Sequence, residues 1–331
     1  MGKKLVYMVF DCETCTLPFA DTIAGGDANK KRKIAIAKPI IYDLGWTLMN
    51  RDGSIIKKQQ FLVAETFSVP AVFNTAYYKE KRPIYLEMIK RGEIEVQPWE
   101  VIMTHFILDL AVADYVGAFN SMFDFKKAIP FTELYMEKLY SPSYYDWEKI
   151  QYGLCEKIVN EPYKKNEKDF DPEHFSFRGE HYELFDLWGM ACETLINRAK
   201  YKEMCLENRM LSNSGDYFKT SAESTYRYLM ENYGFMEAHT ALADAEIESF
   251  ILSKILKKKA ISIGIDYFPF RKLGYTTDFV KTAPAKKQAR YAEIVFQVMD
   301  NYVGDYDVLD ELTVYKKKIV GKMEDLKTMF A

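Results

Sequence analysis

The chain has 331 residues, of which 48% are apolar and 28% charged, which is the composition of a globular protein and excludes a largely disordered one. Its 45 Lys and Arg residues stand against 48 Asp and Glu residues, so the net charge is −3 and a generally basic nucleic-acid-coating protein is excluded. Local basic patches or bound metal ions would have to hold any polyanionic partner.

The five cysteines are scattered and odd in number, which argues against a disulfide framework and against a complete zinc site. Cys12 and Cys15 form one C-x-x-C pair, but we expect Cys12 to point away from the acidic residues beside it. The most apolar long window, residues 99–119, contains three acidic residues and a histidine and does not suit a membrane span. We therefore expect a soluble cytoplasmic protein with no membrane partner.

In the first half of the chain, the sequence pattern predicts three strands followed by a helix. Residues 5–10 form a short apolar run that predicts a buried strand, which ends in residues 11–14. Residues 40–49 and 55–63 flank an Asp-Gly turn and predict a hairpin. Apolar residues then recur at helical spacing over residues 99–113.

The second half alternates strands and helices. Strands are predicted at 115–118 and 182–187, and helices at 125–140, 189–199, 222–233 and 240–258. Ser221 is the expected N-cap of the helix over 222–233, and Gly234 its expected end. This order predicts an α/β fold with a mixed sheet whose first three strands are antiparallel.

Acidic residues stand at the edge of three predicted elements. Asp11 and Glu13 lie two residues apart at the end of the first strand, so both carboxylates can face one metal position. Asp124 opens the helix that follows the strand at 115–118, where a capping role is the simpler alternative. His239 and Asp244 are five residues apart, which places His239 on the loop entering the last long helix.

In this order the three clusters resemble the DEDDh branch of the DnaQ-like 3′–5′ exonucleases. The matching segments are residues 9–14, 116–124 and 238–245. The tyrosine branch of that superfamily would need Tyr four residues before Asp244, where Thr240 stands. The resemblance covers about residues 4–256 and implies an RNase H-like fold flanked by helices.

The resemblance also implies a two-metal phosphodiesterase. Asp11 would bridge two Mg²⁺ or Mn²⁺ ions, Glu13 and Asp244 would complete the site of the attacking water, and Asp124 would hold the second ion. Carboxylate ligands suit such hard ions. His239 would remove the proton of the water, since an imidazole changes charge near neutral pH.

Three neighbouring residues are candidates for substrate binding. Thr14 would place its backbone on the terminal nucleotide, and Leu17 would wedge between the last two bases unless it is a core leucine. Asn120 would contact the terminal nucleotide or cap the following helix.

We therefore expect a DEDDh exonuclease domain over residues 1–258, with insertions at about 20–38, 66–97 and 141–183, and a C-terminal extension over 259–331. The expected activity is 3′–5′ hydrolysis of single-stranded DNA that releases 5′-mononucleotides, with a replication or repair protein as partner. The alternatives are an exoribonuclease that trims RNA and a catalytically silent module that binds nucleic acid or a polymerase.

Residues 254–290, the basic segment, hold ten Lys and Arg residues against two acids, and five aromatic residues stand between the charges. This composition suits a surface that follows phosphates and stacks bases. A solvated helix end followed by aromatic residues that pack onto the domain is the equal alternative.

Overall fold

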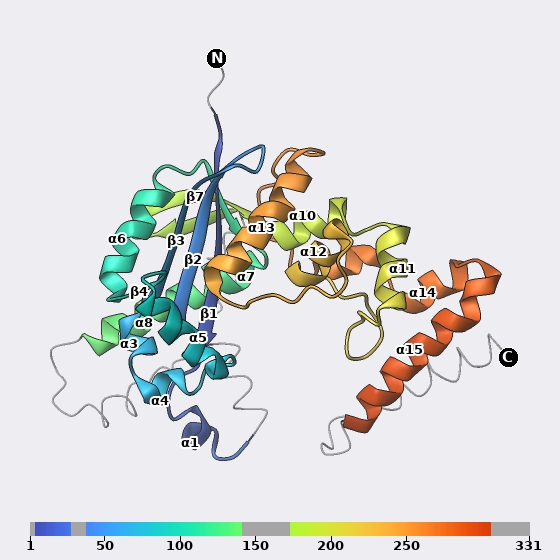
Figure 1. Ribbon diagram of the computed structural model, residues 1–331, viewed down its shortest axis with the longest axis horizontal. Helices are drawn as coiled ribbons and strands as arrows, with labels where there is room; N and C mark the ends of the chain where they lie inside the picture. The colour runs from blue at the N-terminus through green and yellow to red at the C-terminus, as the bar shows by residue number, and fades with distance from the viewer. Residues whose placement is uncertain (1–3, 28–37, 141–172, 306–331) are drawn as a thin grey trace. The chain divides into compact units, whose positions relative to one another are not determined.

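The computed structural model describes residues 4–27, 38–140 and 173–305 (Figure 1). A seven-stranded mixed sheet, flanked by helices, has the order β4-β3-β2-β1-β5-β7-β6. The strands are β1 (Val6–Cys15), β2 (Ile40–Asn50), β3 (Ile55–Val63), β4 (Glu95–Gln97), β5 (Tyr115–Ala118), β6 (His174–Phe177) and β7 (Glu180–Asp186).

The centre of the sheet is made by β1, β2 and β3. β1 runs antiparallel to β2, and β2 antiparallel to β3, around a turn in which Gly53 takes a φ of 94°. The strand expected at residues 5–10 continues to Cys15, because its acidic end still pairs with β2 through a bulge between Glu13 and Thr14. Asp11 and Glu13, which we expected at the end of this strand, lie in its second half.

Parallel strands extend the sheet on both sides. β5 is parallel to β1 and β7 is parallel to β5, and the strands predicted at 115–118 and 182–187 are these two. The strand β4 pairs in parallel with β3 within the segment predicted to be an insertion at 66–97. Much of the insertion predicted at 141–183 lies outside the described residues, but its end forms the antiparallel pair β6 and β7.

Helices and helical turns of the same part of the chain accompany this sheet. They are α1 (Ala20–Ala24), α3 (Ala64–Phe67), α4 (Pro70–Phe73), η1 (Lys79–Lys81), α5 (Arg82–Lys90), α6 (Trp99–Leu110), α7 (Ser121–Phe123), η2 (Asp124–Ala128), α8 (Ile129–Leu139) and α13 (Ala241–Leu256).

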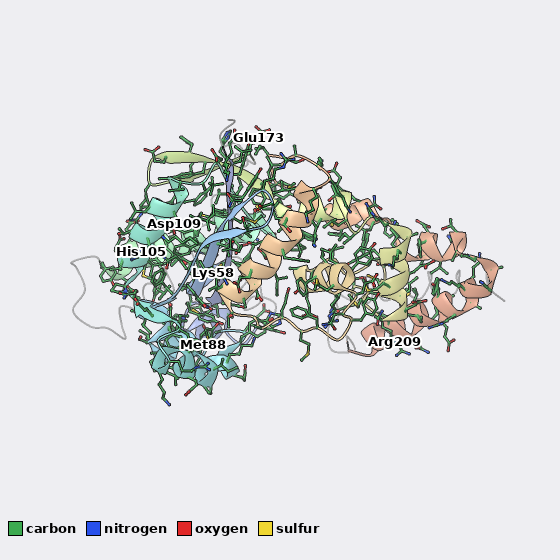
Figure 2. The ribbon with its side chains drawn as sticks, turned by 45° about the horizontal axis from the view of Figure 1, so that its top comes forward. Lys58, Met88, His105, Asp109, Glu173 and Arg209 are labelled. Atoms are coloured by element: carbon green, nitrogen blue, oxygen red, sulfur yellow. The ribbon has the colours of Figure 1, made fainter. Side chains whose placement is uncertain are left out.

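One face of β2 packs on α6. Trp46 is fully buried, its ring contacts Phe106 at 5.4 Å between centroids, and its indole N–H donates to Asp109 at 2.8 Å. Figure 2 shows Asp109 and His105 on α6, and the His105 ring stacks on Phe61 of β3. Apolar residues alternate with polar or small ones over residues 42–48 of β2, and the apolar face is buried on the side of this helix.

The other face of β2 carries α13. Thr47 on this face makes a hydrogen bond with Ser249 of α13, and Gly45 lies against the helix backbone. A Cβ atom at Gly45 would overlap the main chain of Ala241 and Leu242, so the absence of a side chain is what lets the helix approach. Figure 1 shows α13 running across β1 and β2.

The chain divides into two compact units. The first comprises residues 1–187 and 237–265, and the second 188–236 and 266–331. We expected one boundary after residue 258, but residues 188–236 cluster with the C-terminal extension, so neither unit is a single continuous stretch of the sequence. Among the described residues, no helix is long and apolar enough to cross a membrane.

The second unit is helical where it is described. It contains α10 (Leu187–Thr194, from its second residue), α11 (Ala199–Glu207), α12 (Ala222–Met230), η3 (Pro269–Leu273), α14 (Thr276–Thr282) and α15 (Ala285–Asp305). Ser221 caps α12, since its hydroxyl accepts from Ser224 N at 3.2 Å. The helix ends at Glu231, which takes the left-handed conformation expected for Gly234 and stops α12 three residues earlier.

Candidate metal site in the first unit

Asp11 and Glu13 share one face of β1. Asp11 pairs with Gly45 and Glu13 with Asp43, so both carboxylates lie on the side of the sheet that α13 covers. Both residues are only partly exposed. The sequence expectation that they can face one position is consistent with this register.

The helix α13 brings His239 and Asp244 to Glu13. His239 precedes Thr240, the N-cap of α13, and Asp244 lies in the first turn of the helix. The ligand atoms of Glu13, His239 and Asp244 all lie within 4.8 Å of one another. The imidazole Nδ1 is 3.8 Å from a carboxylate oxygen of Asp244 and 3.8 Å from one of Glu237.

Asp124 occupies a π-helical segment. The helix predicted over 125–140 consists of the π-turn η2, which begins at Asp124, and α8, and the short helix α7 precedes them. Asp124 is 4% exposed, and so its carboxylate does not act as a solvated cap. π-Bulges inside helices occur often at functional sites.

Cys12 is the point where the structure corrects the sequence interpretation. Its side chain does point to the face opposite Asp11 and Glu13, but it meets a carboxylate there: the thiol donates to Asp124 Oδ1 at 3.1 Å. The physical reason is that Asp124 comes from the helical layer on that face of β1. Cys12 is thus a hydrogen-bond partner of the second acidic motif.

The carboxylates form one electrostatic cluster. Burial and the nearby charges of Glu248, Asp124, Asp244 and Glu13 raise the pKa of Asp11 well above its usual range. Burial and the charge of Asp244 raise the pKa of Glu13 to about 9. Burial raises the pKa of Asp124 to about 7, although the Cys12 hydrogen bond opposes this.

Glu248 is a member of this cluster that the sequence interpretation missed. It is 3% exposed, and its carboxylate accepts a hydrogen bond from Phe119 N at 3.1 Å. Burial and the charges of Asp124 and Asp244 raise its pKa well above the usual range. The available signal was its position four residues after Asp244, which places both on one face of α13.

Asp43 is a second missed residue, and it holds α13 in place. Its buried carboxylate accepts hydrogen bonds from Tyr85 at 2.8 Å, from Gln60 at 3.0 Å and from the first backbone N–H of α13, at Ala241, at 3.0 Å. An aspartate at a helix N-terminus is favoured by the helix dipole. The signal in the sequence was a single acid in the apolar run of residues 40–46.

The three substrate-binding candidates lie in different environments. Thr14 is half-buried directly after the bulge of β1. Leu17 is 1% exposed in the main hydrophobic core, which favours the core-leucine alternative. Asn120 is exposed with a φ of 126° and precedes α7, but its side chain makes no capping hydrogen bond.

The basic segment is divided between the two units. Its residues up to Ile265, including Lys257, belong to the first unit, and those from Asp266 onward belong to the second. In the second unit Lys272 pairs with Asp266 at 3.0 Å and Lys287 with Glu203 at 3.2 Å. Base stacking by this segment stays a prediction.

No family model, curated protein or solved structure matches the chain. The donor set of the site is made of carboxylate oxygens and one imidazole, and such a set can hold a divalent metal ion. Buried carboxylates that raise one another's pKa values bind a proton or a cation in preference to remaining charged together.

Proposed function

We propose that the protein is a metal-dependent 3′–5′ exonuclease with an RNase H-like fold, acting on single-stranded DNA in the cytoplasm and releasing 5′-mononucleotides. The observation that carries the proposal is the gathering of Glu13, His239 and Asp244 within 4.8 Å, beside the partly exposed carboxylate of Asp11 and the buried carboxylate of Asp124. These residues come from the three acidic clusters of the sequence, which are far apart along the chain.

The carboxylates would hold two Mg²⁺ or Mn²⁺ ions. Asp11 would contact both, Glu13 and Asp244 would complete one site, and Asp124 the other. When bound, such a pair stabilises the attacking and leaving oxygens of an in-line displacement at phosphorus. The added charge also lets an acidic protein bind a polyanion.

His239 would act as the general base. Its imidazole is 30% exposed and lies beside Asp244, so a water held at that carboxylate is within reach of the ring. The imidazole would remove the proton of this water as its oxygen attacks the terminal phosphorus. The P–O3′ bond would break, and the 3′-oxygen of the preceding nucleotide would leave and take a proton from solvent. The Asp244 carboxylate favours the protonated imidazole that results.

The test is a digest of single-stranded DNA and RNA oligonucleotides that carry a label at the 3′ or the 5′ end, with Mg²⁺, with Mn²⁺ and with chelator. We expect stepwise shortening from the 3′ end, release of nucleoside 5′-monophosphates, and no activity in chelator. Asp11→Asn should abolish the activity, and the exposed turn variant Asp52→Asn should retain it.

The same assay separates the alternatives. Preferred shortening of RNA would favour the exoribonuclease. Binding of oligonucleotide without cleavage under any metal condition would favour the silent binding module, and cutting of circular single strands would indicate an endonuclease.

A further inference from the structure

The imidazole of His239 is covered by a residue of the insertion predicted at 66–97. The Tyr78 ring stacks on it with 4.4 Å between ring centroids and 14° between the planes. Tyr77, which is 83% exposed, meets the Tyr78 ring edge-on at 4.8 Å. One face of the imidazole therefore lies against an aromatic surface.

Lys81, three residues further along, binds the backbone that carries this imidazole. Its ammonium group donates to the carbonyl oxygen of Ala238, and the carbonyl oxygen of His239 lies 3.4 Å away. The same group lies 4.8 Å from the centre of the Tyr78 ring. Burial lowers the pKa of Lys81, and the charges of Glu13, Asp244 and Glu237 oppose this shift.

The backbone of His239 needs such support. Its φ is 50°, in the left-handed region that residues with a side chain adopt only when their surroundings impose it. Lys81 contacts the carbonyl oxygens of Ala238 and His239, the two carbonyl groups that flank the N–Cα bond described by this φ angle. Asp43 fixes the next turn by accepting from Ala241 N.

We propose that Tyr78 and Lys81 are positioning residues for His239: Tyr78 fixes the plane of the imidazole, and Lys81 holds the strained backbone that presents it to Glu13 and Asp244. This inference rests on the proposed function for its catalytic meaning, but the positioning itself is a property of the free protein. It assigns the segment at 66–97 a role in the site.

The first measurement is NMR of the histidine ring protons in the full-length, metal-free protein. The chain has only four histidines, and His239→Gln identifies the signal. Stacking on Tyr78 should shift the His239 ring protons by the ring current, Tyr78→Ala should remove that shift, and Tyr78→Phe should keep it. Equal His239 shifts in the wild type and Tyr78→Ala would overturn the proposal.

Lys81 is tested against a neighbour in the same helical turn. Lys81→Met should change the His239 signals, whereas Lys79→Met, at an exposed position of η1, should not. If both substitutions have the same effect, the contribution assigned to Lys81 is wrong.

The second measurement is steady-state kinetics on the substrate found in the end-labelling assay, with saturating metal. Tyr78→Ala should lower kcat about tenfold, a part of the roughly 10²–10⁴-fold supplied by a general base, while KM stays within about twofold. Tyr78→Phe should restore kcat. A raised KM with unchanged kcat would identify Tyr78 as a substrate contact and overturn the positioning role.

The two measurements keep the failures apart. A wild-type protein without nuclease activity would refute the proposed function and leave the NMR result valid. A nuclease whose kcat and His239 signals do not respond to Tyr78→Ala would refute the positioning role alone.

Discussion

Asp11 lies among other carboxylates, whose negative charges repel its own. Burial, and after it the charges of Glu248, Asp124, Asp244 and Glu13, raise the pKa of this carboxyl. The substitution Asp11→Asn introduces an amide of the same shape. It removes the repulsion between charges, and it also removes the oxygen expected to contact both ions.

We therefore expect Asp11→Asn to lose activity and gain stability. The loss should exceed the roughly 10–100-fold seen when only a supporting residue of a metal ligand is removed. The free energy of unfolding of the metal-free protein should rise by about 1 kcal/mol at pH 7 and not at pH 4, where the wild-type carboxylates are protonated. Chemical denaturation at both pH values measures this, and lower stability at pH 7 would contradict it.

Glu248 should act on metal affinity. Glu248→Gln keeps an oxygen that can accept from Phe119 N but removes a charge beside Asp124 and Asp244. We expect metal affinity to fall roughly 10–100-fold, as measured by isothermal titration with Mn²⁺. Glu246→Gln, on a partly exposed position of the same helix, is the matched control. An unchanged affinity in Glu248→Gln would place Glu248 outside the metal site.

For single residues, the sequence predicts those positions that follow from spacing along one strand or helix. The alternation of a strand places Asp11 and Glu13 on one face, and the five-residue interval separates His239 from the helix that carries Asp244. Asp43 was not predictable in the same way, because its partners Tyr85 and Ala241 are distant in sequence. The contact of Cys12 with Asp124 likewise depends on how a helix packs on the sheet.

Among the elements, the contact between β2 and α13 controls the site. Gly45→Ala would force the N-terminal turn of α13 away from the sheet, since a Cβ atom there overlaps its backbone. We expect the free energy of unfolding to fall by about 1–3 kcal/mol and Mn²⁺ affinity to fall with it. Gly234→Ala, where a Cβ atom finds room, is the control. If both variants bind Mn²⁺ like the wild type, the approach at Gly45 does not position the site.

Local sequence signals located these elements but not their irregularities. The helix over 240–258 and the strand over 115–118 correspond closely to α13 and β5, because their apolar patterns are long or sharply bounded. The π-turn at Asp124 and the left-handed residue Glu231 have no such signal. Both depend on packing, and in the second case Glu231 adopts a conformation that the sequence favoured for Gly234.

Across the whole molecule, the buried carboxylates link stability to pH and metal. In the unfolded chain Glu13 and Asp124 release protons at their ordinary pKa values, near 4, but in the folded protein they do so near 9 and 7. Between these values the folded state holds more protons, so stability falls as the pH rises.

A bound cation should reverse this loss. We expect Mg²⁺ or Mn²⁺ to raise Tm more at pH 8 than at pH 5, because the cation stabilises the charged carboxylates of the folded state. Thermal unfolding at both pH values, with and without metal, tests the prediction. Asp11→Asn should show a smaller metal effect, and an equal increase in Tm at the two pH values would contradict the linkage.

The division into two units was the least predictable feature. The sequence indicated one boundary near residue 258, whereas residues 188–236 associate with a segment that follows α13. This association depends on contacts between helices that are distant in sequence, such as α11 with α15, and it leaves no local pattern in the sequence.

The position of α13 in the chain also has a consequence for biosynthesis. A nascent chain that has been translated through α8 already contains Asp11, Glu13 and Asp124, but the helix that brings Asp244 to them has not yet been made. Under the proposed function, a chain synthesised only as far as α8 therefore lacks His239 and Asp244 and cannot hydrolyse a phosphodiester. Activity would begin only once α13 has folded onto β1 and β2.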